Sequence, residues 1–189
     1  MSAGYKGFET RKRSNFKELP PVGAYVAEIR DVRELPPDGK QNHKVYEMMI
    51  EITDGEYKER YHEIYNDQKE RFGSAKYKGI FRLVEPLDND EDWRKRSFES
   101  NLWCVEQSNP GYTWDWNCKS LKGKKIGISV RKRLYTFNGK DGETTEIARF
   151  ETTLDVKAGK CRPVKDRDTR STAENEPNFT EVSDVDVPW

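Results

Sequence analysis

The chain has 189 residues, of which 33% are hydrophobic, 36% charged and 12% aromatic, so one domain with a modest core and some unfolded chain is expected. Its 34 basic and 34 acidic residues cancel, but residues 171–189 hold five acids and no Lys or Arg, which leaves a net charge of +5 on residues 1–170. No apolar run could cross a membrane or serve as a secretory signal, which predicts an intracellular protein.

The first half of the chain predicts an arm followed by three strands. Residues 1–23 mix basic and aromatic residues and end in Pro and Gly, so an irregular arm is expected. Residues 24–35 alternate as a strand, and a slip in the alternation predicts a bulge near Arg30 and Asp31. Alternation returns in 43–53 and, briefly, in 61–65, which we interpret as the second and third strands.

The apolar period then changes from two to that of a helix. Residues 74–86 place Tyr77, Ile80, Phe81 and Val84 at helical spacing, with Ser74 as a plausible N-cap. A second apolar stripe consists of Phe98, Leu102 and Val105 and ends at Asn109-Pro110-Gly111.

Period two returns in a predicted hairpin. Residues 123–137 direct Ile126, Ile128 and Val130 to one side, "NGKDG" (138–142) is a strong turn signal, and 144–156 is the return strand. Ala148, Phe150, Leu154 and Val156 are expected on one face of that return strand. Periodicity ends after residue 165, and disorder is expected for 166–189.

This element order predicts a mainly β fold. Five antiparallel strands with one or two helices inserted between the third and fourth follow the plan of an OB-fold barrel, in which a bent first strand serves both sheets. The expected organisation is an arm at 1–23, an OB-fold domain at 24–165 and a disordered acidic tail at 166–189. The same elements could also build another α+β sandwich.

Motifs for catalysis are missing from the sequence. It contains no phosphate-binding loop, no dinucleotide fingerprint, no nucleophile elbow and no zinc-protease helix. Three widely spaced cysteines and two histidines suit free thiols better than a metal site or a disulfide. We therefore expect no enzyme activity, no cofactor and no metal.

The strongest functional signal is a run of basic residues. From Lys119 to Arg133 there are seven Lys and Arg residues and no acid. If alternate residues face the core, the opposite face of the strand carries cations and aromatic rings together, which suits phosphates and unpaired bases. An ordinary solvated face is the alternative. The predicted nucleic-acid-binding residues are Lys122, Lys124, Lys125, Arg131, Arg133, Tyr135, Phe137 and, on the return strand, Arg149.

A second aromatic cluster lies in "NPGYTWDWNC" (109–118). Tyr112, Trp114 and Trp116 could line a groove or cap the barrel. Packing is favoured for the two tryptophans.

The segment "SNPGYTWDW…LKGKKIGISVRKRLYTFNGKDGETTEIARFETTLDVKAGKCRPVK" resembles phage and mobile-element proteins of low-GC Gram-positive bacteria that are found among replication and recombination genes. The shared features are the Asn-Pro-Gly-aromatic turn, the Leu-Lys-Gly-Lys strand start, the glycine hairpin and the closing basic-Pro element. The resemblance covers residues 16–165 by order of elements and is most specific over 109–142. It implies an OB-fold protein similar to single-stranded-DNA-binding proteins.

The end of the chain, "TEVSDVDVPW", resembles the tails of bacterial and phage single-stranded-DNA-binding proteins, which close on an acidic segment with an aromatic tip. Here the matching positions are Asp184, Asp186, Pro188 and Trp189. Trp replaces the usual Phe, and the acids are sparser. The resemblance implies a docking tail for replication and recombination proteins.

Together these patterns predict sequence-independent single-stranded DNA binding without catalysis, in the cytoplasm of a bacterial host cell. No membrane contact is expected. The sequence does not determine the oligomeric state, and a homo-oligomer is compatible with it. The alternatives are an RNA-binding or protein-adaptor OB module and a metal-dependent nuclease or recombination factor.

Overall fold

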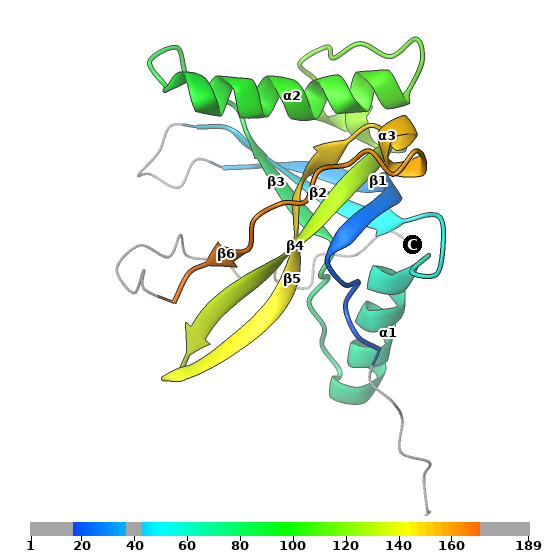
Figure 1. Cartoon of the computed structure of the whole chain (residues 1–189), viewed down its shortest axis with the longest axis vertical. Helices are drawn as coiled ribbons and strands as arrows, with labels where there is room; N and C mark the ends of the chain where they lie inside the picture. Colours follow the sequence, from blue (N-terminus) through cyan, green and yellow to red (C-terminus); the bar gives the residue numbers. More distant parts are fainter. Residues whose placement is uncertain (1–16, 37–42, 171–189) are drawn as a thin grey trace, which may run out of the picture.

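The computed structural model of the chain describes residues 17–36 and 43–170, whose arrangement is shown in Figure 1. This part is mainly β, with six strands in one sheet and three α-helices. Its elements in chain order are β1 (Gly23–Leu35), β2 (Val45–Ile52), α1 (Arg60–Phe72), β3 (Ile80–Val84), α2 (Asp92–Ser108), the 3-10 helix η1 (Cys118–Leu121), β4 (Lys125–Phe137), β5 (Lys140–Glu151), α3 (Thr153–Lys157) and β6 (Arg167–Asp168).

The strands lie in the order β3-β2-β1-β4-β5, with antiparallel neighbours, and β6 runs parallel to β4 off this path. β1 belongs to both halves of the sheet, since its first part pairs with β4 and its later part with β2. The predicted bulge is confirmed, because Ile29 pairs with Ile50 whereas Asp31 pairs with Met49 and Arg30 is the extra residue. A bulge bends the strand that carries it, which allows β1 to serve both halves.

The two ends of the sheet approach each other without closing it. Among the described residues β3 and β5 form no hydrogen-bonded ladder, so the expected closed barrel is not seen. The rings of Phe81 on β3 and Phe150 on β5 nevertheless meet with centroids 4.5 Å apart. Side chains, rather than backbone hydrogen bonds, therefore join these two strands.

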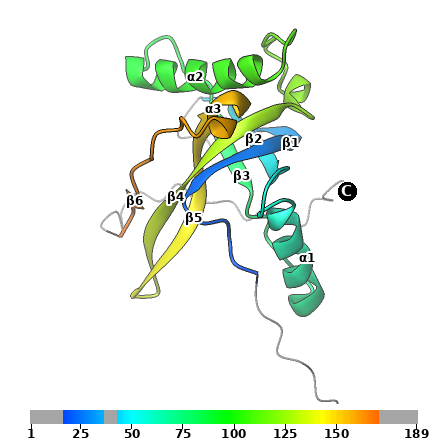
Figure 2. The same cartoon turned by 45° about the vertical axis from the view of Figure 1, so that its right-hand side comes forward.

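The core lies inside the curved sheet and beneath α2. The alternation predicted for β1, β2 and β4 is confirmed, since the inward residues Ala27, Ile29, Met48, Ile50, Ile52, Ile126 and Ile128 are all fully buried. The predicted helical stripe is also confirmed, with Phe98, Leu102 and Val105 of α2 buried against this core. Figures 1 and 2 both show α2 lying across one end of the sheet, while the β4–β5 hairpin extends away from it.

The third predicted strand, 61–65, is wrong, because these residues begin α1. The cause is Glu51, a buried carboxylate on β2 that accepts the backbone N–H groups of Tyr61 and His62 at 3.2 and 2.7 Å. These are donors in the first turn of a helix, which have no partner within the helix itself. The apolar residues Tyr61, Ile64 and Tyr65 then fall on one helical face and are buried.

The helix predicted for 74–86 is also wrong, because these residues form a loop and then β3. The Tyr77 hydroxyl donates to the Glu51 carboxylate at 2.7 Å, which holds the loop against α1. Gly79 follows, where a Cβ would lie 2.2 Å from the Ile50 carbonyl oxygen. This close approach leads into a strand in which Phe81 and Leu83 face the core.

The predicted return strand, 144–156, is corrected at its end. β5 stops at Glu151 and α3 follows, so Leu154 points outward and is 71% exposed. Ala148 is an extra residue in the β4–β5 ladder, which places Ile147 rather than Ala148 in the core.

Of the segment expected to be disordered, 166–170 is ordered and contains β6, while 171–189 lie outside the described residues, as do 1–16 and 37–42. In the described part, no helix combines the length and the apolar character needed to cross a membrane.

Candidate nucleic-acid interface

The eight predicted binding residues do not form one surface, because α3 separates them. Alternation along β4 places Gly127 and Ser129 between Lys125 and Arg131 on the outer face. Val156 of α3 covers Gly127 so closely that a Cβ there would lie 2.5 Å from the Val156 Cγ2 atom. The start of β4 and its Arg131–Phe137 segment therefore lie on either side of α3 (Figures 1 and 2).

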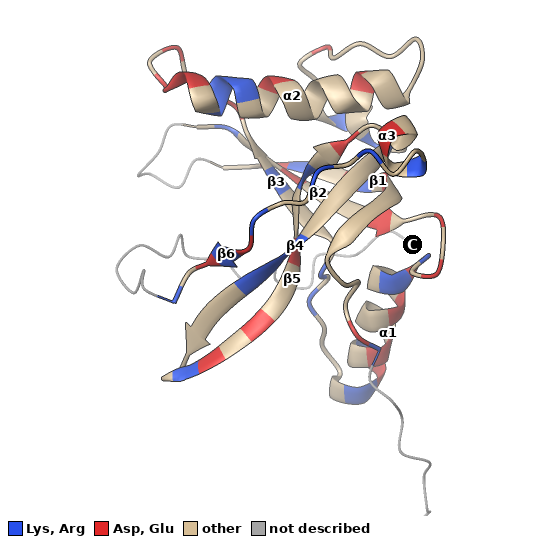
Figure 3. Cartoon of the chain, viewed as in Figure 1, with Lys and Arg blue, Asp and Glu red and all other residues tan. Residues whose placement is uncertain are grey.

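The Arg131–Phe137 group lies on the projecting hairpin, where acidic residues of β5 face it. Arg131 pairs with Glu146 at 2.7 Å and Lys132 with Glu143 at 3.1 Å. Figure 3 shows these acidic positions of β5 beside the basic segment of β4. Residues 131–146 hold four basic and three acidic side chains, so the hairpin has a net charge of only +1.

The aromatic residues of the hairpin differ in exposure. Phe137, at the start of the turn, is 68% exposed. Tyr135 is half-buried, and its ring lies so close to Gly142 that a Cβ there would be 2.8 Å from the ring. Arg133 lies between them and the body of the sheet, beside Arg167 of β6. One exposed ring, rather than a row of rings, is therefore offered at the tip of the hairpin.

Arg149 is held by the protein itself. Its Nε donates to Glu151 at 2.7 Å and its Nη2 to the Arg162 carbonyl oxygen at 3.0 Å. The same Glu151 carboxylate accepts the Ser129 hydroxyl at 2.6 Å. This network fastens the segment after α3 to the sheet.

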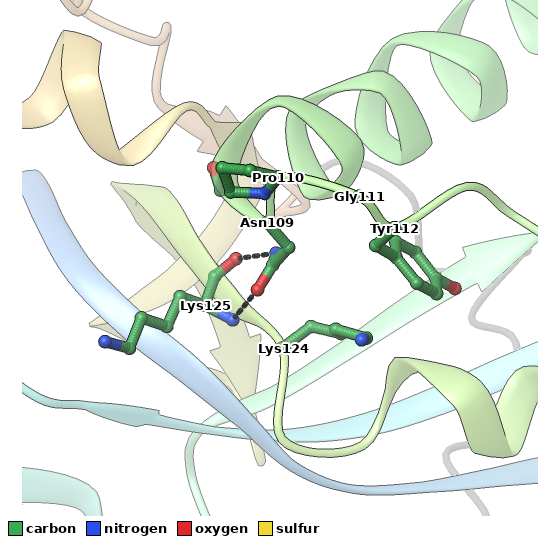
Figure 4. A pocket seen from close by; sticks show the side chains of 7 residues that line it. Asn109, Pro110, Gly111, Tyr112, Lys124 and Lys125 are labelled. Atoms are coloured by element: carbon green, nitrogen blue, oxygen red, sulfur yellow. Dashed lines mark hydrogen bonds between the residues drawn. The ribbon is translucent and has the colours of Figure 1, made fainter.

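The predicted lysines 124 and 125 line one open hollow of about 500 Å³ at the end of α2, shown in Figure 4. Asn109 builds this site. Its amide Nδ2 donates to the Lys125 carbonyl oxygen at 2.8 Å, and its Oδ1 accepts the Lys125 N–H at 3.0 Å. Pro110 and Gly111, with φ of 84° at Gly111, then form the turn that returns Tyr112 to the hollow.

The electrostatics of the hollow favour an anion. Its lining residues, which include no acid, are Ser108, Asn109, Pro110, Gly111, Tyr112, Lys124 and Lys125. The Lys124 ammonium lies 4.2 Å from the centroid of the Tyr112 ring, which fixes the direction of the charge. Nearby Asp115 has a lowered pKa, chiefly because it accepts the Ser120 hydroxyl and the Asn117 N–H, and to a lesser degree through Lys124.

Lys122 lies two residues before Lys124 and contacts the outer face of β1. Its ammonium pairs with Asp31 at 3.0 Å, and Asp31 lies two residues before Arg33 on the same face of the strand. Alternation after the bulge directs Asp31 and Arg33 outward and Val32 inward.

Sequence reasoning missed a charged row that crosses three strands. Arg33 of β1, Glu47 of β2 and Arg82 of β3 are direct cross-strand neighbours. The Glu47 carboxylate is 3% exposed, and it accepts Arg33 Nη2 at 2.6 Å and Arg82 Nη2 at 2.7 Å. The alternation of β1 and β2 could have placed Arg33 and Glu47 outward, but Arg82 lies in the segment interpreted as a helix.

The two tryptophans of the loop after α2 behave differently. Trp114 is half-buried and meets the core residue Tyr46 edge to face, with centroids 5.9 Å apart. Trp116 is 65% exposed, with a positive φ of 62°, and stacks on Phe98 at 6.3 Å. The sequence favoured a packing role for both tryptophan rings. The burial of the two rings fits that role better for Trp114 than for Trp116.

The predicted tail residues Asp184, Asp186, Pro188 and Trp189 lie outside the described residues. Within 17–36 and 43–170, no group of three or more His, Cys, Asp or Glu side chains is placed to hold a metal ion. Cys104, Cys118 and Cys161 are free thiols, and burial raises the pKa of Cys104 to about 11, which keeps it protonated at neutral pH.

No protein-family model matches the chain, and no curated protein matches it. The site must therefore be interpreted from its own chemistry.

Proposed function

We propose that the chain binds single-stranded DNA without base specificity and without catalysis. The observation that carries this proposal is the hollow lined by Lys124, Lys125 and Tyr112, whose lining holds two lysines and no acid. Figure 4 shows the Lys124 side chain directed towards Tyr112 and the Lys125 side chain directed away from it. Ammonium groups neutralise backbone phosphates, and that contact does not depend on base sequence. The exposed Phe137 ring adds a stacking surface at the hairpin tip, worth about 1–3 kcal/mol per base.

The strand order supports an OB-type barrel as the framework of this function. In that fold the first strand pairs with the second and the fourth, and a helix lies between the third and fourth strands. β1 pairs with β2 and β4, and α2 lies between β3 and β4. The contact between Phe81 and Phe150 takes the place of the missing ladder between β3 and β5.

The acidic end of the chain is proposed to recruit replication or recombination proteins of a phage or mobile element. Trp189 would enter an apolar pocket of the partner, and Asp184 and Asp186 would steer the encounter towards its Lys or Arg residues. The opposite charges of residues 171–189 and 1–170 support this division of roles.

The test is equilibrium binding of a labelled dT oligomer at low salt to the full chain and to the variant Lys124→Ala/Lys125→Ala. We expect the variant to bind at least about tenfold more weakly, with the same loss on other base sequences. The matched control is Lys69→Ala/Lys78→Ala. Lys69 of α1 lies over the Tyr65 ring at 5.7 Å, and Lys78 lies in the loop before β3, so this control removes the same charge and the same kind of ring interaction away from the hollow.

Equal affinity of the two double variants would contradict the proposed site. Equal binding of poly-U and dT oligomers would favour the RNA-binding alternative. Cleavage of labelled DNA with Mg²⁺ or Mn²⁺ would favour the nuclease.

A further inference from the structure

Three parallel rows of side chains cover the outer face of β1, β2 and β3. The register places them as Leu35–Val45–Val84, Arg33–Glu47–Arg82 and Asp31–Met49–Ile80. Every residue of these rows is half-buried except Glu47, which is buried. The charged row thus lies between two rows that are largely apolar.

The central carboxylate positions both arginines. Arg33 directs Nε and Nη2 at one Glu47 oxygen, at 2.9 and 2.6 Å, and Arg82 directs Nε and Nη2 at the other, at 2.8 and 2.7 Å. Each guanidinium plane is thereby fixed, and the row keeps a net charge of +1. The Arg33 and Arg82 side chains remain 39% and 28% exposed, so both present part of their surface outward.

We infer that the Arg33–Glu47–Arg82 row is a second contact site for the phosphates of single-stranded DNA, with Glu47 as the positioning residue. This inference rests on the proposed function and extends its site. Guanidinium groups bind phosphate in a planar fork, and fixing them beforehand lowers the entropic cost of binding. Met49 and Ile80 give bases an apolar surface on one side of the row, and Val45 and Val84 on the other.

The row connects to the lysine hollow through Lys122. That ammonium holds Asp31, which lies in the row beside Arg33. A strand that leaves the hollow along β1 therefore reaches Arg33 and then Arg82, across the sheet and away from the hairpin. The binding path proposed here crosses β1, β2 and β3 instead of following β4.

The experiment measures the salt dependence of dT-oligomer affinity for the full chain and for Arg33→Met/Glu47→Leu/Arg82→Met. Replacing the whole ion triad with apolar residues of similar size avoids leaving a buried charge unpaired. The slope of log K against log salt falls by about 0.7 for each phosphate of a single strand that the protein no longer neutralises, so a decrease of about 1.4 is expected. If the row had only a structural role, the triad variant would change the fraction of folded chain and leave the slope of log K against log salt unaltered.

The matched control is Asp67→Asn/Lys69→Gln/Arg71→Gln, which removes one acid and two bases from α1. It should keep the slope of the unchanged protein. If the triad variant fails to fold, Arg33→Gln leaves Glu47 paired with Arg82 and should lower the slope by about 0.7. An unchanged slope and affinity in a folded triad variant, or in Arg33→Gln, would overturn the inference; failure of the unchanged protein to bind would instead reject the proposed function.

Discussion

Glu51 is the residue on which the α1 region depends. Its carboxylate is fully buried and accepts four hydrogen bonds, from the N–H groups of Ile52, Tyr61 and His62 and from the Tyr77 hydroxyl. Burial raises the pKa of this carboxyl above its ordinary value of 4.5, against the opposing effect of these hydrogen bonds. A raised folded-state pKa means that stability from this group is present below pH 4.5 and is lost as pH rises through the folded pKa.

We predict that Glu51→Gln lowers the free energy of unfolding by about 1–3 kcal/mol, because its amide NH₂ would face the His62 N–H with no acceptor. Glutamine does not titrate. The stability difference between the unchanged protein and Glu51→Gln should therefore shrink as pH rises above 4.5. Urea unfolding at several pH values measures this difference, with Glu70→Gln on α1 as the control for removing one carboxylate. A difference that grows with pH would contradict the assignment.

At the residue scale, the lysines could be chosen as candidate binding residues from the sequence alone, whereas the arginine row could not. A run of four lysines between 119 and 125 without an acid is visible in the printed chain, and two of them line the hollow. Arg33, Glu47 and Arg82 are far apart in sequence. Only the register of three strands brings them together, and that register depends on tertiary packing.

At the element scale, α3 decides which part of β4 is accessible. We predict that Gly127→Ala lowers the free energy of unfolding by about 1–3 kcal/mol, because its Cβ would lie 2.5 Å from Val156 Cγ2 and 2.9 Å from the Thr152 carbonyl oxygen. Gly127→Ala/Val156→Ala should recover part of this loss, since the backbone clash remains. A double-mutant cycle by chemical denaturation gives the coupling. Strict additivity of the two changes would show that α3 does not cover Gly127.

Strands with one buried face were predictable, whereas short apolar runs were not. β1, β2 and β4 each span eight residues or more, so period two was clear in each despite the bulge in β1. Residues 61–65 and 80–84 are short enough for their apolar residues to suit either period. Contacts with other segments decide between helix and strand. The Glu51 carboxylate accepts a backbone N–H group in the first turn of α1, and pairing with β2 makes 80–84 a strand.

At the scale of the whole molecule, charge pairing divides the basic residues into two groups. The hairpin arginine and lysine at 131 and 132 face acids on β5, whereas the lysine hollow has no acid in its lining. The described strands lie in the order β3-β2-β1-β4-β5, and no hydrogen-bonded ladder closes the sheet among these residues. A mainly β fold could be predicted from the alternating segments of the sequence. The separation by α3 could not, because 153–157 continue the alternation of β5 in sequence.

The most direct measurement is a tryptophan-fluorescence titration of the full chain with dT oligomers at several salt concentrations. We expect fluorescence quenching at low salt and a steep linear fall of log affinity with log salt, with a slope of about 0.7 per phosphate neutralised. Duplex DNA of the same length should bind more weakly. No binding at low salt, or an affinity independent of salt, would contradict the claim that this protein binds single-stranded DNA through its phosphates.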